Sequence, residues 1–303
     1  MDTLLPLFSN NILPIFITAG TGFLLGKLID LDPRTISRVT FYIFSPCLVF
    51  KLLTENELKQ NAVIQMVGIA FGSVLIMGLI TFIISRFLKF NRKLTVAVML
   101  TTMFVNAGNY GLALNDYAFG KEALAYASIY FVTSGTTMYT IGVLVASMGK
   151  ASFSESIRGL FRLPTLYAVL IAFLFKQMTW DLPMSIQRPI DLLAQAAIPG
   201  MLVLLGLQLQ RAGWEANRVA LGAAALIRLV ISPVVAYGLS IPLALQGPAL
   251  QAGITEASMP SAVMGTVLAT EYEAEPEFVT TVVTITTILS PLTLTPILAL
   301  LGG

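Results

Sequence analysis

The feature that most constrains this chain is a series of apolar segments, each about as long as a lipid bilayer is thick. A helix needs about 20 residues to cross ~30 Å of hydrocarbon. Short polar or Pro/Gly connectors separate the segments, so the sequence predicts an all-α polytopic membrane protein with about ten transmembrane helices. We place these at residues 11–29, 36–53, 62–88, 94–114, 120–148, 163–179, 186–208, 217–244, 249–270 and 276–301.

Composition excludes several other classes of protein. Only 11% of the 303 residues are charged, spread over the whole length, whereas a soluble domain has about 25%. The net charge of +2 is too small to indicate a nucleic-acid partner. The chain has no histidine, one cysteine (Cys47) and no Gly-rich phosphate loop. We therefore expect no enzyme, no metal site, no cofactor and no ATP hydrolysis.

The connectors predict an orientation in the cell membrane. Those after the odd-numbered segments hold 12 of the 18 Lys and Arg residues, and those after the even-numbered segments hold 5. The positive-inside rule then places the odd-numbered connectors in the cytoplasm and both termini outside. The longest connector, 149–162, is expected to be cytoplasmic.

The two halves of the chain resemble each other weakly. Pro14 matches Pro164, and Asn106–Leu114 aligns with Pro260–Leu268 at nearly the same offset. A repeat of five helices must insert its second copy upside down. The sequence therefore predicts two inverted five-helix repeats, 1–148 and 163–303, joined by the connector 149–162.

Helix-breaking residues interrupt two of the segments near their centres. Segment 94–114 contains Asn106–Gly111 (NAGNYG), and segment 249–270 contains Ser258–Ser261 (SMPS). About twelve apolar residues precede each break, so both lie ~18 Å into the membrane. Half-helix N-termini at that depth offer free N–H donors and favour an anion. The alternative for either break alone is a kink or a close helix contact.

The same residues resemble a known family. The segments NAGNYGL (106–112) and Met259-Pro260 followed by LATEY (268–272) are similar to the crossover regions of the auxin efflux carrier family. Val105 and Ala113 stand where many members have proline. The resemblance implies an NhaA-like fold with broken crossover helices 4 and 9, a scaffold, a mobile transport part and a homodimer. It places the substrate carboxylate beside Asn106, Tyr139, Pro260 and Gln195.

Three polar residues inside the segments are candidates for coupling transport to an ion or a proton. Glu256 lies one turn before Pro260, Arg228 lies in the middle of segment 217–244, and Thr133 lies in segment 120–148. Ionisable residues at membrane depth are costly and indicate function. The structural alternatives are an Arg–Glu pair, a snorkelling arginine and a threonine bonded to the preceding turn.

We therefore expect a secondary transporter that moves a small organic anion, a carboxylate or an auxin-like acid, by alternating access. Coupling to Na⁺ or H⁺ stays open. The alternative is a Na⁺/H⁺-type antiporter of the same fold, which needs closely spaced intramembrane carboxylates. The candidate substrate-binding residues are Asn106, Asn109, Gly111, Tyr139, Gln195, Pro260 and Ser261.

Overall fold

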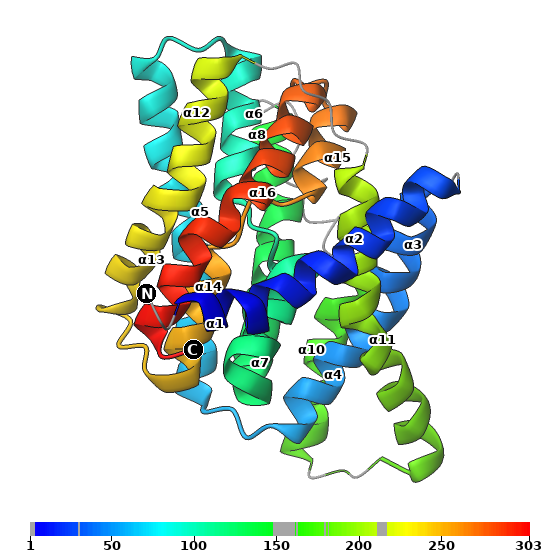
Figure 1. The fold of residues 1–303 in the computed structure, drawn as a ribbon. Coiled ribbons are helices and arrows are strands. Elements are labelled where there is room, and N and C mark those ends of the chain that lie inside the picture. Colours follow the sequence, from blue (N-terminus) through cyan, green and yellow to red (C-terminus); the bar gives the residue numbers. More distant parts are fainter. Residues whose placement is uncertain are drawn as a thin grey trace.

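The computed structural model describes residues 4–29, 31–147, 161, 163–178, 180, 182–210 and 217–303. Regular structure in these ranges is helical apart from one antiparallel β-bridge (Figure 1). The predicted cytoplasmic connector 149–162 lies outside the described residues except for Phe161.

The first half of the chain forms five helical stretches, three of which contain a π-helical turn. They are α1 (Leu4–Leu7), η1 (Phe8–Ile12) and α2 (Leu13–Leu28); α3 (Pro33–Val39), η2 (Thr40–Phe44) and α4 (Ser45–Glu55); α5 (Gln60–Phe87); α6 (Arg92–Met103); and η3 (Ala107–Gly111), α7 (Leu112–Thr137), η4 (Met138–Gly142) and α8 (Val143–Ala146).

The second half, as far as it is described, is helical as well. It comprises α10 (Pro164–Gln177); α11 (Met184–Leu209); α12 (Arg218–Leu226), η5 (Ile227–Ile231) and α13 (Ser232–Ser240); α14 (Gly247–Ala257); α15 (Met264–Glu271); and α16 (Pro276–Leu301).

Seven helices in the described ranges are long and apolar enough to cross a membrane. One of them, Ala107–Ala146, contains a turn at Gly120, where φ is +80°. The other predicted segments, 94–114, 163–179 and 249–270, are interrupted or short. Helix α6 ends at Met103, α10 has 14 residues, and a non-helical stretch separates α14 from α15. The chain is thus an all-helical protein with multiple candidate spans.

Local sequence explains several helix starts and irregularities. Asn91 and Asn217 accept hydrogen bonds from backbone N–H groups in the first turns of α6 and α12, as N-cap residues do. Pro46 lacks an N–H group and so cannot complete the ladder in its helix. The backbone widens into the π-helical turn η2, and the Ser45 hydroxyl donates to the Thr40 carbonyl at 2.9 Å.

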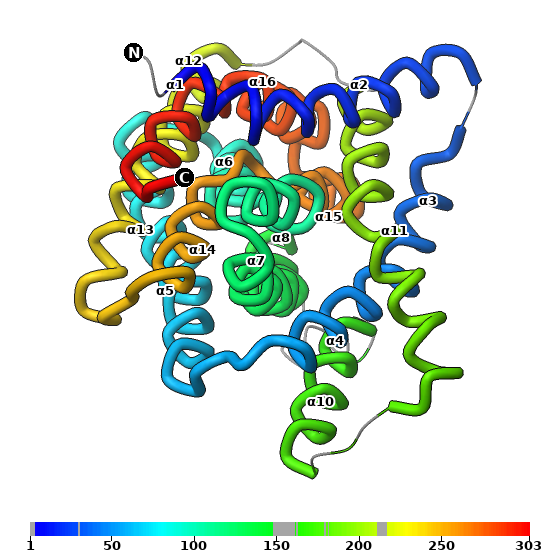
Figure 2. Tube along the Cα trace, turned by 60° about the horizontal axis from the view of Figure 1, so that its bottom comes forward, coloured from blue at the N-terminus to red at the C-terminus, as the bar shows by residue number. Residues whose placement is uncertain are grey.

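The helices form two groups (Figure 2). One group, which we call the α2–α11 group, contains α2, α3, α4, α10 and α11. The other, the crossover group, contains α7 together with α5, α6 and α12 to α16. In the first group α2 and α11 pack very closely, since a Cβ atom at Gly206 would overlap the backbone of Ala19. Small residues allow such backbone approach between membrane helices.

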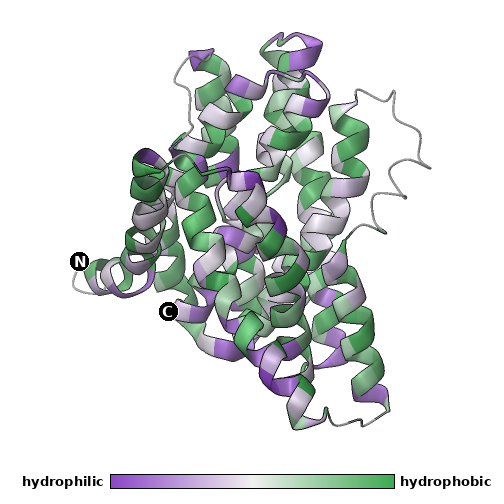
Figure 3. Ribbon diagram, turned by 90° about the vertical axis from the view of Figure 1, so that its right-hand side faces the viewer, coloured by the Kyte–Doolittle hydropathy of each residue, from purple (hydrophilic) through white to green (hydrophobic). Residues whose placement is uncertain are grey.

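Large apolar side chains remain exposed on the outer faces of the helices, among them Leu24, Phe71, Leu170 and Leu292. Figure 3 shows hydrophobic residues along much of the helix surfaces and hydrophilic residues at many helix ends. A soluble protein would bury such side chains, so this surface fits a lipid environment.

Candidate functional site

The two interrupted helices meet at their breaks. Residues 104–106 between α6 and η3 are not helical and run antiparallel to residues 260–262, with a β-bridge between Val105 and Ser261. The Asn106 N–H donates to the Pro260 carbonyl at 2.8 Å, and the Ala262 N–H donates to the Phe104 carbonyl at 2.9 Å. We call this pair of crossing segments the crossover.

The break predicted at Ser258–Ser261 is confirmed, because α14 ends at Ala257. The first break begins two residues earlier than expected, at Phe104, and Ala107–Gly111 form the π-helical turn η3. Irregular backbone inside a membrane must find partners within the protein. Here two backbone hydrogen bonds join the segments, and the Ser261 hydroxyl adds a bond to the Thr101 carbonyl at 2.7 Å.

The start of η3 presents backbone donors without acceptors. The Gly111 N–H donates to the Asn106 carbonyl at 3.0 Å. The N–H groups of residues 107–110 make no hydrogen bond to the part of the chain that the structure describes. Residues 107–111 are all buried. A helix start with free N–H groups carries a partial positive charge and attracts an anion.

Two asparagine side chains stand beside these donors. Asn106 is 5% exposed, and its Nδ2 has no hydrogen-bonding partner among the described residues. Asn109 is 4% exposed, and its Nδ2 donates to Gln208 Oε1 of α11 at 3.4 Å. The sequence prediction missed Gln208. A polar residue near the C-terminus of an apolar helix was the only signal that could have identified it.

The glycines of the first break lie in close contacts. Gly111 has helical φ and ψ angles of −62° and −45°, so its backbone conformation does not itself require glycine. A Cβ atom at position 111 would overlap the Glu256 carboxylate, and one at position 108 would lie 2.8 Å from the Phe131 ring. Glycine is needed here because other groups approach the backbone closely.

Glu256, whose carboxylate lies against Gly111, is fully buried. Its Oε1 accepts a hydrogen bond from Asn115 Nδ2 at 3.1 Å, and the same Nδ2 donates to the Gly111 carbonyl at 2.9 Å. No described residue forms a hydrogen bond with Glu256 Oε2. The carboxyl group therefore joins α14 to the first turn of α7.

Arg228 does not pair with Glu256, so the structural alternative of an Arg–Glu pair is wrong, and an exposure of 1% for Arg228 excludes the snorkelling alternative. Its Nη1 donates to the Thr102 carbonyl at 2.7 Å, and its Nη2 donates to the Ala257 carbonyl and to Ser232. Thr102 and Ala257 lie in the last turns of α6 and α14. Each helix C-terminus carries about half a negative charge, so two of them balance one guanidinium.

Three predicted site residues remain, Thr133, Tyr139 and Gln195. The Thr133 hydroxyl donates to the Ile129 carbonyl at 2.8 Å, which is the structural alternative. Tyr139 lies half-buried in η4, and Gln195 lies on an exposed face of α11. No hydrogen bond within the described ranges links these three side chains to the crossover. Their roles in transport stay predictions.

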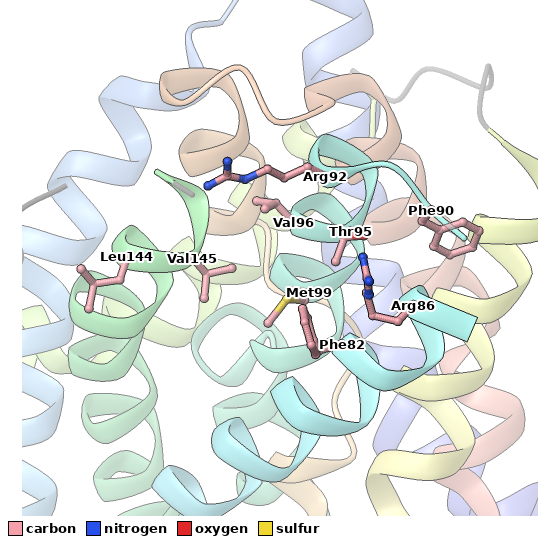
Figure 4. A pocket seen from close by; sticks show the side chains of 9 residues that line it. All are labelled: Phe82, Arg86, Phe90, Arg92, Thr95, Val96, Met99, Leu144 and Val145. Carbon is pink, nitrogen blue, oxygen red and sulfur yellow. The ribbon is translucent and has the colours of Figure 1, made fainter. Parts of the chain in front are cut away.

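A cavity of about 450 Å³ lies elsewhere, between α5, α6 and α8 (Figure 4). Arg86 and Arg92 contribute guanidinium groups to it, and Phe82 and Met99 contribute apolar surface. None of the crossover residues lines this cavity. Its two cations lie at the end of the helices for which the connector charges predict a cytoplasmic location.

Comparison with known proteins gives the family. The model of the membrane transport protein family matches residues 7–298. The chain belongs to this family. The match confirms the resemblance to auxin efflux carriers seen in the sequence. Because it belongs to this family, the protein is a transporter. Its long apolar helices agree with a protein that crosses the membrane several times.

Curated relatives of this membrane transport protein cover nearly its whole length. An "Uncharacterized transporter" of Methanothermobacter thermautotrophicus is 29% identical over 93% of this chain and 94% of its own. A "Putative malonate transporter" of Rhizobium meliloti is 27% identical over 96% and 94%. An "Uncharacterized transporter" of Methanocaldococcus jannaschii is 23% identical over 88% of each chain.

Proposed function

We propose that this membrane transport protein is a secondary carrier that moves a small organic anion by alternating access. The observation that carries the proposal is the buried group of donors at the crossover. The N–H groups of residues 107–110 and the Asn106 amide have no protein acceptor among the described residues. Buried donors without acceptors cost free energy, and a bound carboxylate would satisfy several of them at once.

A dicarboxylate fits this site well in chemical terms. One carboxylate would accept from the start of η3 and from Asn106, while Asn109 and Gln208 would meet the far end of the molecule. The relative from Rhizobium meliloti is named as a malonate transporter. Malonate is therefore the first substrate to test.

The contact between Asn109 and Gln208 joins the two groups of helices. Asn109 belongs to η3 beside α7, and Gln208 belongs to α11. A substrate bound between them would contact both groups. We propose that the crossover group moves against the α2–α11 group and exposes the site to one side of the membrane and then to the other.

The architecture that we propose has ten transmembrane helices in two inverted five-helix repeats, with broken helices at α6–η3 and α14–α15. Both termini lie outside the cell membrane and the connector 149–162 lies in the cytoplasm. One observation supports a common side for the termini: helix α1 packs on α16 near both chain ends (Figure 1). We also propose that the carrier is a homodimer.

A Na⁺/H⁺-type antiporter is the second candidate, because Glu256 is a fully buried carboxyl group at the depth of the crossover. It ranks lower because cation exchange needs more than one closely placed carboxylate. No second carboxylate contacts Glu256 among the described residues.

The test is counterflow of radiolabelled malonate, malate, lactate and indole-3-acetate in proteoliposomes. We expect saturable exchange of at least one of these anions, with Asn106→Ala losing most of it. Asn10→Ala, which changes an exposed asparagine of η1, is the matched control. If no anion exchanges, and a Na⁺ gradient moves protons instead, the antiporter replaces this proposal.

A further inference from the structure

The carboxyl group of Glu256 is enclosed by α14, the start of α7 and η3. Asn115 is fully buried as well and supplies its only hydrogen bond from the described residues. The Gly111 backbone packs against the other side of the carboxyl group. Glu256 Oε2 and Asn115 Oδ1 are both buried without a partner in the described part of the chain.

The charged groups around Glu256 do not neutralise it. The guanidinium of Arg228 donates to the Ala257 carbonyl, and no ion pair joins it to Glu256. Tyr130 of α7 and Tyr110 of η3 are buried, with the Tyr110 hydroxyl 3.3 Å from Ser290. The other ionisable residues on the elements that pack against α14 are Asp116, Tyr117, Lys121, Glu122 and Tyr126 of α7, Tyr237 of α13, Arg86 in the last turn of α5 and Glu277 in the first turn of α16.

A negative charge without a counter-ion is very costly in such a place. Either a proton or a metal cation must therefore accompany Glu256. A sodium ion needs several oxygen ligands around it, but the carboxyl group packs so closely on Gly111 that a Cβ atom there would overlap it, and no second carboxylate of the described residues is in contact. A proton needs no such space. The packing favours a protonated carboxyl group.

We propose that Glu256 is the proton-binding site of this carrier and that a proton and the substrate anion move together. The inference rests on the proposed function and names its coupling ion. Asn106, which belongs to the anion site, accepts a hydrogen bond from the N–H of Gly111, and Gly111 packs against Glu256. An ionised Glu256 would repel an anion held a few residues away, whereas the neutral form would not.

The proton balance is simple. Glu256 takes one proton from water on one side while the site is open to that side, and the anion binds. After the crossover group has moved, the anion leaves and the proton passes to water on the other side. Because the protonated form binds the anion better, anion affinity is expected to fall as the pH rises.

The experiment uses the full chain in proteoliposomes, with the membrane potential clamped. Wild type should exchange malonate at equal pH, and an inward proton gradient should drive accumulation of about tenfold for each tenfold gradient if one proton moves per anion. Glu256→Gln should keep exchange but lose proton-driven accumulation, and its malonate affinity should no longer depend on pH. Glu277→Gln, at an exposed helix start, is the control that should behave like wild type.

The outcomes separate the two proposals. Accumulation driven by a Na⁺ gradient and not by a proton gradient would overturn the proton site, as would proton-driven accumulation in Glu256→Gln. Exchange without any effect of a proton gradient in wild type would also overturn it and leave the carrier function standing. Absence of anion exchange in wild type would overturn the function and the coupling together. Infrared spectroscopy adds a readout without transport: a carboxylic acid band present in wild type and missing from Glu256→Gln supports the site.

Discussion

The backbone N–H of Asn106 and the carbonyl oxygen of Pro260 are joined by a hydrogen bond of 2.8 Å, although the two residues come from opposite halves of the chain. With the bond from Ala262 to Phe104, it makes a short antiparallel crossing between two interrupted helices. The crossing leaves the start of η3 with free donors on one side. On the other side, two helix C-termini meet the guanidinium of Arg228.

The contact between Gly111 and Glu256 predicts a large effect of a single methyl group. Gly111→Ala should lower the free energy of unfolding by about 1–3 kcal/mol, because its Cβ overlaps the carboxylate. The double variant Gly111→Ala/Glu256→Ala should recover part of this loss, since the two changes affect one contact. Thermal unfolding in detergent measures both. Gly222→Ala, where a Cβ meets nothing within 4 Å, is the control, and purely additive losses would contradict the contact.

Arg228 should be needed for a stable crossover. In Arg228→Gln the carbonyls of Thr102 and Ala257 lose a charged donor. Hydrogen bonds to charged groups contribute about 1.5–3 kcal/mol each, so we expect a marked fall in the unfolding temperature. Arg218→Gln, at the exposed start of α12, should unfold like wild type. If Arg228→Gln unfolds at the same temperature as wild type, the guanidinium is not needed to balance the partial negative charges at the C-termini of α6 and α14.

Gln208 should contribute to substrate affinity although it lies on a different group of helices from the crossover. Removing its side chain in Gln208→Ala takes away the partner of Asn109. The loss of one hydrogen bond of about 1 kcal/mol corresponds to a roughly fivefold weaker apparent affinity. Malonate concentration series in proteoliposomes measure this change. Gln246→Ala, an exposed glutamine before α14, serves as the control, and equal affinities would remove Gln208 from the site.

Close packing of α2 on α11 should be essential to the α2–α11 group. Gly206→Ala places a Cβ against the backbone of Ala19, and backbone cannot move aside as a flexible side chain can. We expect a loss of about 1–3 kcal/mol in stability. Gly20→Ala is a matched control on α2, since nothing lies within 4 Å of its Cβ. If both variants unfold at the same temperature, the helices have room to separate.

Local sequence was enough to identify the positions of the two breaks. Pro260 cannot donate a backbone hydrogen bond, and Asn106 and Asn109 favour non-helical conformations, so an interruption follows from residue chemistry alone. The boundaries of the first break were less accurate. The segment Ala107–Gly111 is helical and leads directly into α7. The interruption lies instead at Phe104 and Val105, two apolar residues whose segment forms backbone hydrogen bonds with the other break.

The sequence by itself determined that this protein is helical, lies in a membrane and has two interrupted helices. Those properties depend on hydrogen bonds within one segment, which the bilayer makes obligatory. Only the tertiary structure decided the partners: Arg228 with two helix ends, Glu256 with Asn115 and Gly111, and Asn109 with Gln208. In a soluble helix, an apolar stripe marks the buried face. Here lipid is as apolar as the protein interior, so the sequence pattern does not reveal which faces meet.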